Sequence, residues 1–291
     1  MSRALAGLSI ALLAAAACAT RDHQTWFTYQ VAGEAATLHA RYGKADGLLT
    51  RASAQAQDPA EHARTELAFA RLAREQDDLL TAQVELAKAQ AHADLLPANA
   101  PERLRIALEG AWIALATGSP ESAADAFARV ERESLVQLGE ADPLTGYAAA
   151  GRGEALRRAG DAEGARREIE VAIERFMGSA SIDHVKPSEP LGLVAALTSL
   201  GRLDLAEGEL DAARTALRDA AALAGEELGT NHPVLADVLT ELALVELALG
   251  DRTAADRAAD RAVAIAASRL PDGHPIRVAA IAAQERCAAA P

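Results

Sequence analysis

Small and apolar residues recur at helical spacing along most of the chain. One clear run is Leu210, Ala213, Leu217 and Ala220, and another is Ala255, Ala259 and Ala262. Residues three or four positions apart lie on the same face of an α-helix, so each run predicts an amphipathic helix with one apolar stripe. Alanine and leucine dominate these stripes, and alanine is the best helix former. The pattern therefore favours an all-α protein.

The helical pattern is punctuated at regular intervals. A glycine or aspartate ends one predicted helix, and an alanine follows five residues later inside the next. This combination occurs at Asp77 and Ala82, Gly118 and Ala123, Gly160 and Ala165, Gly208 and Ala213, and Gly250 and Ala255. Successive turn positions lie 41, 42, 48 and 42 residues apart. The interval of 48 contains residues 177–190, whose Gly, Ser and Pro predict a loop. An interval near 42 indicates an internal repeat.

The repeat has a simple physical interpretation. Glycine at the turn permits the positive φ that ends the first helix. The alanine lies where two helices cross too closely for a larger side chain. One helical pair cannot bury its apolar stripe alone, whereas stacked pairs can, so the repeat predicts a solenoid.

The positions of small and apolar residues resemble the tetratricopeptide repeat over about residues 60–285. In the last unit these positions are Leu239, Leu242, Ala243, Ala255, Ala259 and Ala262, and in the unit before they are Leu197, Leu200, Gly201, Ala213, Leu217 and Ala220. Asp204 and Glu246 depart from the family pattern where an aromatic residue is common. The resemblance implies a right-handed superhelical solenoid of about five helical hairpins, with the repeat domain over 59–291.

A His-Pro pair recurs at the same interval. His232 precedes Pro233, and His274 precedes Pro275. The 42-residue period with this pair resembles the kinesin-light-chain-like subtype of the family. Proline suits the first position of a helix, and the histidine before it would cap the helix. Two histidines on adjacent repeats could also bind a metal, but no third ligand recurs beside them, so we expect no metal site.

Residues 18–58 precede the clear repeats. They predict two helices, roughly over 25–39 and 44–56, that form either a degenerate first repeat or an N-terminal helical cap. Terminal repeats of a solenoid need atypical, capping surfaces.

The first twenty residues differ from the rest of the chain. Arg3 is their only charge, residues 4–17 are small or apolar, and Cys18 follows. This layout predicts a signal peptide over 1–17, and Cys18 after three alanines resembles the lipobox of bacterial lipoproteins, with Ala15 where leucine is usual. We expect a lipid anchor at Cys18 and, since Ala19 follows, an outer-membrane lipoprotein facing the periplasm. There are two alternatives. One is ordinary signal-peptide cleavage, which would give a soluble periplasmic or secreted protein, and the other is a retained anchor.

Charge and motifs exclude several functions. The net charge is −13, with 42 acidic against 29 basic residues, and nucleic-acid binding needs a basic face instead. The only other cysteine is Cys287, which excludes a disulfide framework. We find no phosphate-binding glycine loop, GxSxG elbow or HExxH motif. We therefore expect that the chain is not an enzyme and uses no cofactor.

The family resemblance implies that the first helix of each pair lines a concave groove that holds a partner protein or peptide. The groove residues carried over in this way are Arg64, Arg71, Arg74, Arg105, Trp112, Tyr147, Arg157 and Arg202. Arginine and aromatic side chains are common interface anchors, so the groove would suit an acidic peptide. The alternative is that these arginines pair with glutamates of neighbouring helices and that Trp112 is core.

These observations together predict a non-enzymatic scaffold at the bacterial cell envelope. Two alternatives remain open. The alanine-rich end 280–291 could stack on another copy, making a self-assembling repeat protein. An aromatic groove could instead bind glycan, making an accessory factor for the cell wall.

Overall fold

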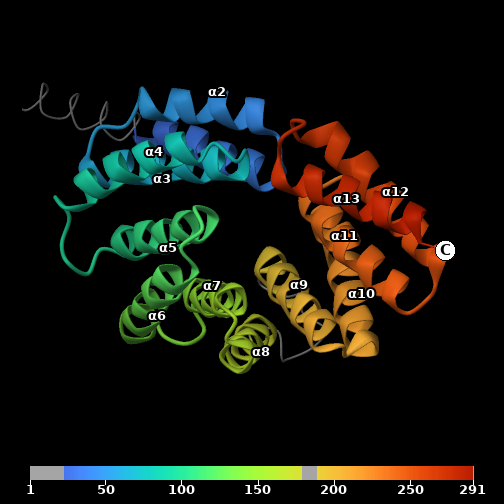
Figure 1. The fold of residues 1–291 in the computed structure, drawn as a ribbon. Helices are drawn as coiled ribbons and strands as arrows, with labels where there is room; N and C mark the ends of the chain where they lie inside the picture. The colour runs from blue at the N-terminus through green and yellow to red at the C-terminus, as the bar shows by residue number, and fades with distance from the viewer. Residues whose placement is uncertain (1–22, 179–188, 291) are drawn as a thin grey trace, which may run out of the picture. The chain divides into compact units, whose positions relative to one another are not determined.

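The computed structural model describes residues 23–178 and 189–290. Cys18, the predicted signal peptide and most of the predicted loop 177–190 lie outside the described residues. The described part contains helices and no strand. A helical segment over 23–38 comes first, and the following helices are α2 (Tyr42–Ser53), α3 (Pro59–Glu75), α4 (Leu79–Ala93), α5 (Pro101–Ala116), α6 (Pro120–Gln137), α7 (Pro143–Ala159), α8 (Ala162–Gly178), α9 (Pro190–Glu207), α10 (Leu210–Glu227), α11 (Pro233–Ala248), α12 (Arg252–Arg269) and α13 (Pro275–Ala289) (Figure 1).

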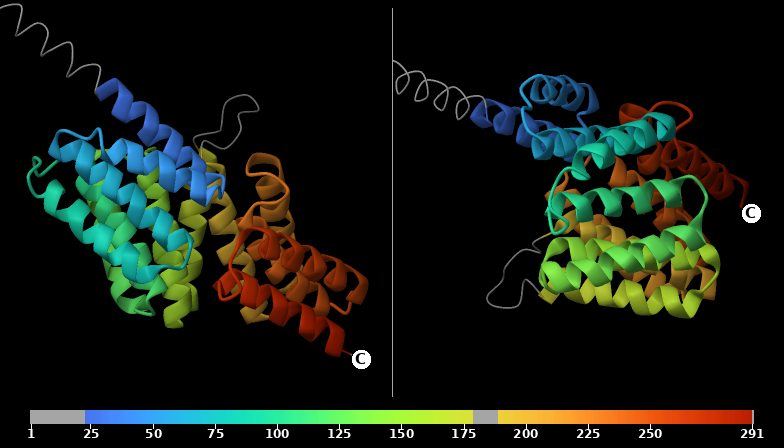
Figure 2. Two further views of the ribbon diagram at one scale, coloured as in Figure 1. Left: turned by 90° about the horizontal axis from the view of Figure 1, so that it is seen from above. Right: turned by 90° about the vertical axis from the view of Figure 1, so that its left-hand side faces the viewer.

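The chain divides into two compact units. The first is Met1–Ile106 and the second is Ala107–Pro291, so the boundary falls inside α5. In the second unit, each helix packs on its neighbours along the chain from α6 to α13. Helices α11, α12 and α13 lie against one another in all views (Figures 1 and 2). No helix of the described residues is both long and apolar enough to span a membrane.

The predicted turns are confirmed. The five turn residues all have positive φ, at 62° for Asp77, 85° for Gly118, 88° for Gly160, 83° for Gly208 and 82° for Gly250. This left-handed conformation ends the first helix of each hairpin, and glycine adopts it without a steric penalty. The hairpins are therefore α3 with α4, α5 with α6, α7 with α8, α9 with α10, and α11 with α12.

The alanines five residues after each turn are buried, as the sequence pattern predicts. Ala82, Ala123, Ala165, Ala213 and Ala255 are completely buried. A second small residue lies seven positions before each turn, and at Gly153 and Gly201 it faces the partner helix of the hairpin. At Gly201 in α9, an added Cβ would lie 2.5 Å from Cγ of Leu217 in α10. The two helices of a hairpin thus approach closely because both contribute small residues at the crossing.

The N-terminal segment is a sixth hairpin with the same construction. Ala40 takes the turn position with φ of 51°, and Ala45, five residues later, is completely buried. Gly33 lies seven residues before the turn, and its Cβ would lie 2.7 Å from Cδ2 of Leu49 in α2. The structure therefore favours the degenerate first repeat over a separate cap. The sequence pattern missed the register because alanine replaces the turn glycine.

The His-Pro pairs act as predicted. Nδ1 of His232 accepts a hydrogen bond from the backbone N–H of Val234 at 3.2 Å, and Nδ1 of His274 accepts one from Ile276 at 3.3 Å. Each histidine caps a helix that begins with proline, which lacks an N–H that would need a partner there. The same proline position recurs in α3, α5, α7, α9, α11 and α13, at Pro59, Pro101, Pro143, Pro190, Pro233 and Pro275. The recurring feature is thus the proline, and histidine is one of several capping residues.

Candidate partner-binding surfaces

The first helices of successive hairpins lie side by side in the second unit. Helix α7 contacts α9, α9 contacts α11, and α11 contacts α13. We call the surface formed by these four helices the first-helix face. Tyr147 and Arg157 of α7 and Arg202 of α9 lie on these helices, as the family resemblance implies.

Arg157 is held by a buried carboxylate of its own helix. Glu154 is 5% exposed and accepts hydrogen bonds from Nε and Nη2 of Arg157, both at 2.9 Å. It also accepts from Arg158 at 2.7 Å and from the hydroxyl of Ser199, on α9, at 3.0 Å. Burial opposes the negative charge, but Arg157, Arg158 and nearby Arg202 outweigh it and lower the pKa of Glu154 to about 2. Arg157 therefore has a strong partner within the chain.

Arg202 is also paired. Its Nε donates to Glu241 at 2.8 Å and its Nη2 donates to Asp237 at 2.7 Å, and both carboxylates belong to α11. Burial opposes the positive charge, yet the carboxylates of Asp237, Glu241 and Glu154 raise the pKa of the guanidinium. The first-helix face consequently carries a line of alternating charges that link α7, α9 and α11.

The arginines predicted in the first unit differ in their surroundings. Arg64 makes a bidentate pair with Glu34, at 2.9 and 2.7 Å, and it lies over the ring of Trp26 at 5.9 Å. Arg74 lies 3.0 Å from Glu75. Arg71 and Arg105 are exposed, and Nη1 of Arg105 lies 3.8 Å from a carboxylate oxygen of Glu102. Arg71 and Arg105 are thus the two of this set most accessible to a partner.

The two predicted aromatic anchors are half-buried. The ring of Trp112 packs edge-on against that of Phe127, with centroids 4.9 Å apart. Tyr147 packs in the same way against Phe176, at 5.3 Å, and its hydroxyl donates to Glu189 at 3.0 Å. Both rings contribute to the packing of the second unit as well as to its surface.

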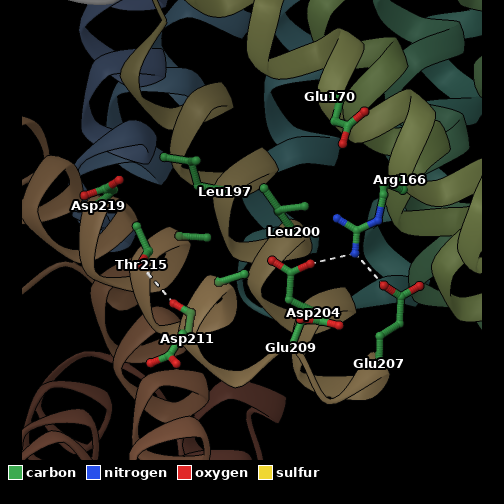
Figure 3. A pocket seen from close by; sticks show the side chains of 12 residues that line it. Arg166, Glu170, Leu197, Leu200, Asp204, Glu207, Glu209, Asp211, Thr215 and Asp219 are labelled. Carbon is green, nitrogen blue, oxygen red and sulfur yellow. Dashed lines mark hydrogen bonds and ion pairs between the residues drawn. The ribbon is translucent and has the colours of Figure 1, made fainter.

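The second unit also has an open cleft that the sequence did not predict. It is formed by α8, α9 and α10, and we call it the acidic cleft (Figure 3). Leu197 and Leu200 of α9 lie between side chains of α8 on one side and of α10 on the other. Six carboxylates line the cleft, those of Glu170, Asp204, Glu207, Glu209, Asp211 and Asp219.

Two arginines pair with three of these carboxylates. Nη2 of Arg214, on α10, donates to Asp211 at 2.6 Å, and Arg166 pairs with two others. Nη2 of Arg166, on α8, donates to Asp204 at 2.6 Å and to Glu207 at 2.5 Å, and both contacts raise the pKa of its guanidinium. The cleft therefore keeps an excess of negative charge over leucine side chains. The signal in the sequence was the carboxylate-rich stretch 204–211 around Gly208, where Asp204 replaces an expected aromatic residue.

One group of three side chains in the described residues could hold a metal ion. It consists of His62, Glu66 and His92 in the first unit. His232 and His274, the pair that recurs in the sequence, act as helix caps instead.

Comparisons with known proteins agree with this architecture. Residues 192–268 match the family model of the tetratricopeptide repeat. These residues contain α10, α11 and most of α9 and α12, where the repeat pattern is clearest. No curated protein is similar to the chain in sequence.

Several solved structures share the fold. A Rap protein complexed with competence and sporulation factor has a TM-score of 0.61 at 15% identity, covering 91% of this chain and 74% of its own. BtubC (BKLC) from P. vanneervenii has a TM-score of 0.55 at 17% identity, and the match covers 87% of this chain and 93% of that protein. A variant of a putative kinesin light chain with nearly identical repeats, from Podosopora anserina, has a TM-score of 0.51 at 21% identity. That match covers 73% of this chain and 98% of the other. The predicted all-α helical-repeat fold is confirmed.

Proposed function

We propose that this chain is a protein-interaction scaffold whose second unit binds a basic, amphipathic segment of a partner protein in the acidic cleft. The observation that carries the proposal is the combination of an apolar floor and an acidic rim. An amphipathic segment could bury its apolar side chains on Leu197 and Leu200 while its lysines or arginines meet the rim. Complementary charge of this kind speeds association and selects the partner.

The acidic cleft is a better docking surface than the paired arginines of the first-helix face. An acidic peptide would have to displace Glu154 from Arg157, or Asp237 and Glu241 from Arg202. Each displacement would break an existing, partly buried ion pair and leave the displaced carboxylate without its counter-charge, which costs free energy. In the acidic cleft, Arg166 pairs with two of the six carboxylates and Arg214 pairs with a third, so the rim keeps an excess of negative charge. Capture of an acidic peptide by the more exposed Arg71 and Arg105 remains a separate prediction.

The role of a scaffold is supported by the class of fold. The Rap structure that resembles this chain is a complex with competence and sporulation factor. A helical-repeat surface of the same kind would let this chain hold a segment of another protein without any catalytic step. Self-association and glycan binding remain alternatives to be separated by the experiments below.

We also propose that the scaffold acts at the bacterial cell envelope, anchored by lipid at Cys18. The support is the sequence of the first eighteen residues, with Arg3, an apolar run and then Cys18. Metabolic labelling with a radioactive fatty acid should mark the native chain and leave the Cys18→Ser variant unlabelled. Equal labelling of both would contradict the anchor.

The partner segment can be identified by site-specific photo-crosslinking. A photoreactive residue replaces Thr215, which is exposed and lines the acidic cleft on α10. We expect mass spectrometry to show crosslinks to a partner segment rich in Lys or Arg and in large apolar residues. A crosslinked segment that is acidic, a second copy of this chain, or the absence of any protein product would contradict the proposal.

Charge variants test the same surface. The double variant Asp211→Lys and Asp219→Lys reverses two charges of the rim, and we expect it to abolish the crosslinks. The matched control Glu163→Lys and Glu226→Lys makes the same change of net charge at exposed positions outside the cleft. Equal loss of crosslinks in both double variants would show that net charge, rather than the cleft, attracts the partner. A third variant, Arg71→Glu with Arg105→Glu, should retain the crosslinks.

A further inference from the structure

The hairpin of α3 and α4 brings two histidines and a glutamate together at its surface. His62 and Glu66 are four residues apart on α3, so they lie on the same face of that helix. His92 is in the last turn of α4. All three side chains are half-buried, which leaves them accessible to a small ion from solvent.

Small residues hold the two helices close enough for this contact. Ala63 of α3 and Ala89 and Ala93 of α4 are completely buried in one cluster. His62 and His92 are sequence neighbours of Ala63 and Ala93, so the close crossing of the helices places the two rings against each other. The ring centroids are 4.9 Å apart and the planes are inclined by 20°. The backbone of a packed hairpin therefore fixes the positions of all three side chains.

The polar atoms of the three side chains converge. Nδ1 of His92 lies 2.7 Å from Oε2 of Glu66. One potential ligand atom from each residue lies within 4.8 Å of the other two. A tetrahedral zinc site with bonds of about 2.0–2.1 Å places its ligand atoms about 3.4 Å apart. Rotations of these side chains about their own bonds would be needed to reach that geometry.

We propose that His62, Glu66 and His92 bind a divalent transition-metal ion such as Zn²⁺. Two imidazoles and a carboxylate suit zinc, cobalt and nickel, whereas magnesium and calcium prefer oxygen ligands alone. Three protein ligands leave a coordination position for water. The site differs from the acidic cleft and lies in the other unit.

A simpler interpretation is that His92 and Glu66 form only a hydrogen-bonded pair between the two helices. That pair would need neither His62 nor a metal. The two interpretations differ in what zinc does to the histidines, because a metal site engages both rings and a hydrogen-bonded pair engages one.

Metal binding can be measured on the chain purified without a histidine tag. Titration calorimetry with Zn²⁺ should show one tight site, and Co²⁺ should give the visible absorption bands of a cobalt–histidine site. We expect His62→Ala, His92→Gln and Glu66→Gln each to weaken Zn²⁺ binding by more than about tenfold, because each removes a ligand. The control His39→Ala removes an exposed histidine elsewhere in the first unit and should leave the affinity unchanged. Absence of a one-to-one site, or equal weakening by the control, would overturn the proposal.

A second measurement needs no variant. Diethylpyrocarbonate modifies accessible imidazoles, and mass spectrometry maps the modified residues. Saturating Zn²⁺ should protect both His62 and His92 while His39 stays reactive. If Zn²⁺ protects neither ring, or His92 alone, the three side chains do not form a metal site.

Discussion

The buried carboxylate of Glu154 gives the sharpest test of the charge network on the first-helix face. Its four hydrogen bonds come from Arg157 and Arg158 on its own helix and from Ser199, whose bond joins α7 to α9. We expect Glu154→Gln to destabilise the second unit. Glutamine has nearly the same shape, so the change removes the charge and leaves the packing almost intact.

The magnitude follows from the pKa of Glu154. Burial raises this pKa, but Arg157, Arg202 and Arg158 lower it more, from its usual 4.5 to about 2. That difference corresponds to about 3 kcal/mol of folding free energy at neutral pH. Because the folded pKa lies below the unfolded pKa, this stabilisation is fully present above about pH 4.5 and is lost as the pH falls toward 2. At pH 3 about 1 kcal/mol should remain.

Urea unfolding followed by circular dichroism measures this directly, with native chain and Glu154→Gln compared at several pH values between 7 and 3. The difference in free energy of unfolding should be about 3 kcal/mol at pH 7 and should shrink toward pH 3. The control is Glu163→Gln, which removes a carboxylate that pairs with Arg167 at the solvent-exposed surface and should have no measurable effect. A difference at pH 7 that stays the same at pH 3 would refute the electrostatic explanation, and so would no difference at pH 7.

Three further changes test the construction of the repeat, each by the free energy of unfolding from urea titration. Ala213→Leu adds volume at a completely buried helix crossing and should cost about 1–3 kcal/mol, whereas Ala212→Leu, at an exposed position beside it, should cost much less. At Gly208 there is open space for a new Cβ, but φ is 83°. Gly208→Ala should therefore cost about 1 kcal/mol through backbone strain alone. An unchanged free energy of unfolding would contradict the turn conformation. His232→Ala removes the cap of α11 and should cost about 1 kcal/mol, while His232→Asn should restore most of it because asparagine also caps helices.

Much of the fold could be predicted because its signals are local. The turn at Gly250 and the buried position of Ala255 depend on residues only a few positions apart, and they recur at each repeat. Prediction weakened where one position departed from the pattern. At the N-terminal hairpin Ala40 takes the turn conformation without glycine, and the packing of Gly33 on Leu49 holds the helices in register.

The surfaces were less predictable than the core. The family frame placed Arg157 and Arg202 on the first helices correctly, but their partners could not be read from the sequence. Arg202 pairs with Asp237, which is 35 residues away, and Arg157 shares Glu154 with Ser199, which is 45 residues from Glu154. A chain with 42 carboxylates offers many possible partners for each arginine, and spacing does not choose among them.

The sequence by itself determined the helices, the turns and the small residues at helix crossings, because each depends on short-range spacing and on the size of one side chain. Only the tertiary structure decided which charges neutralise one another and which remain. It left more carboxylates than arginines around Leu197 and Leu200 in the acidic cleft. It also brought His62, Glu66 and His92 together across one hairpin. Both features depend on the distance between side chains of different helices, and that distance is set by packing.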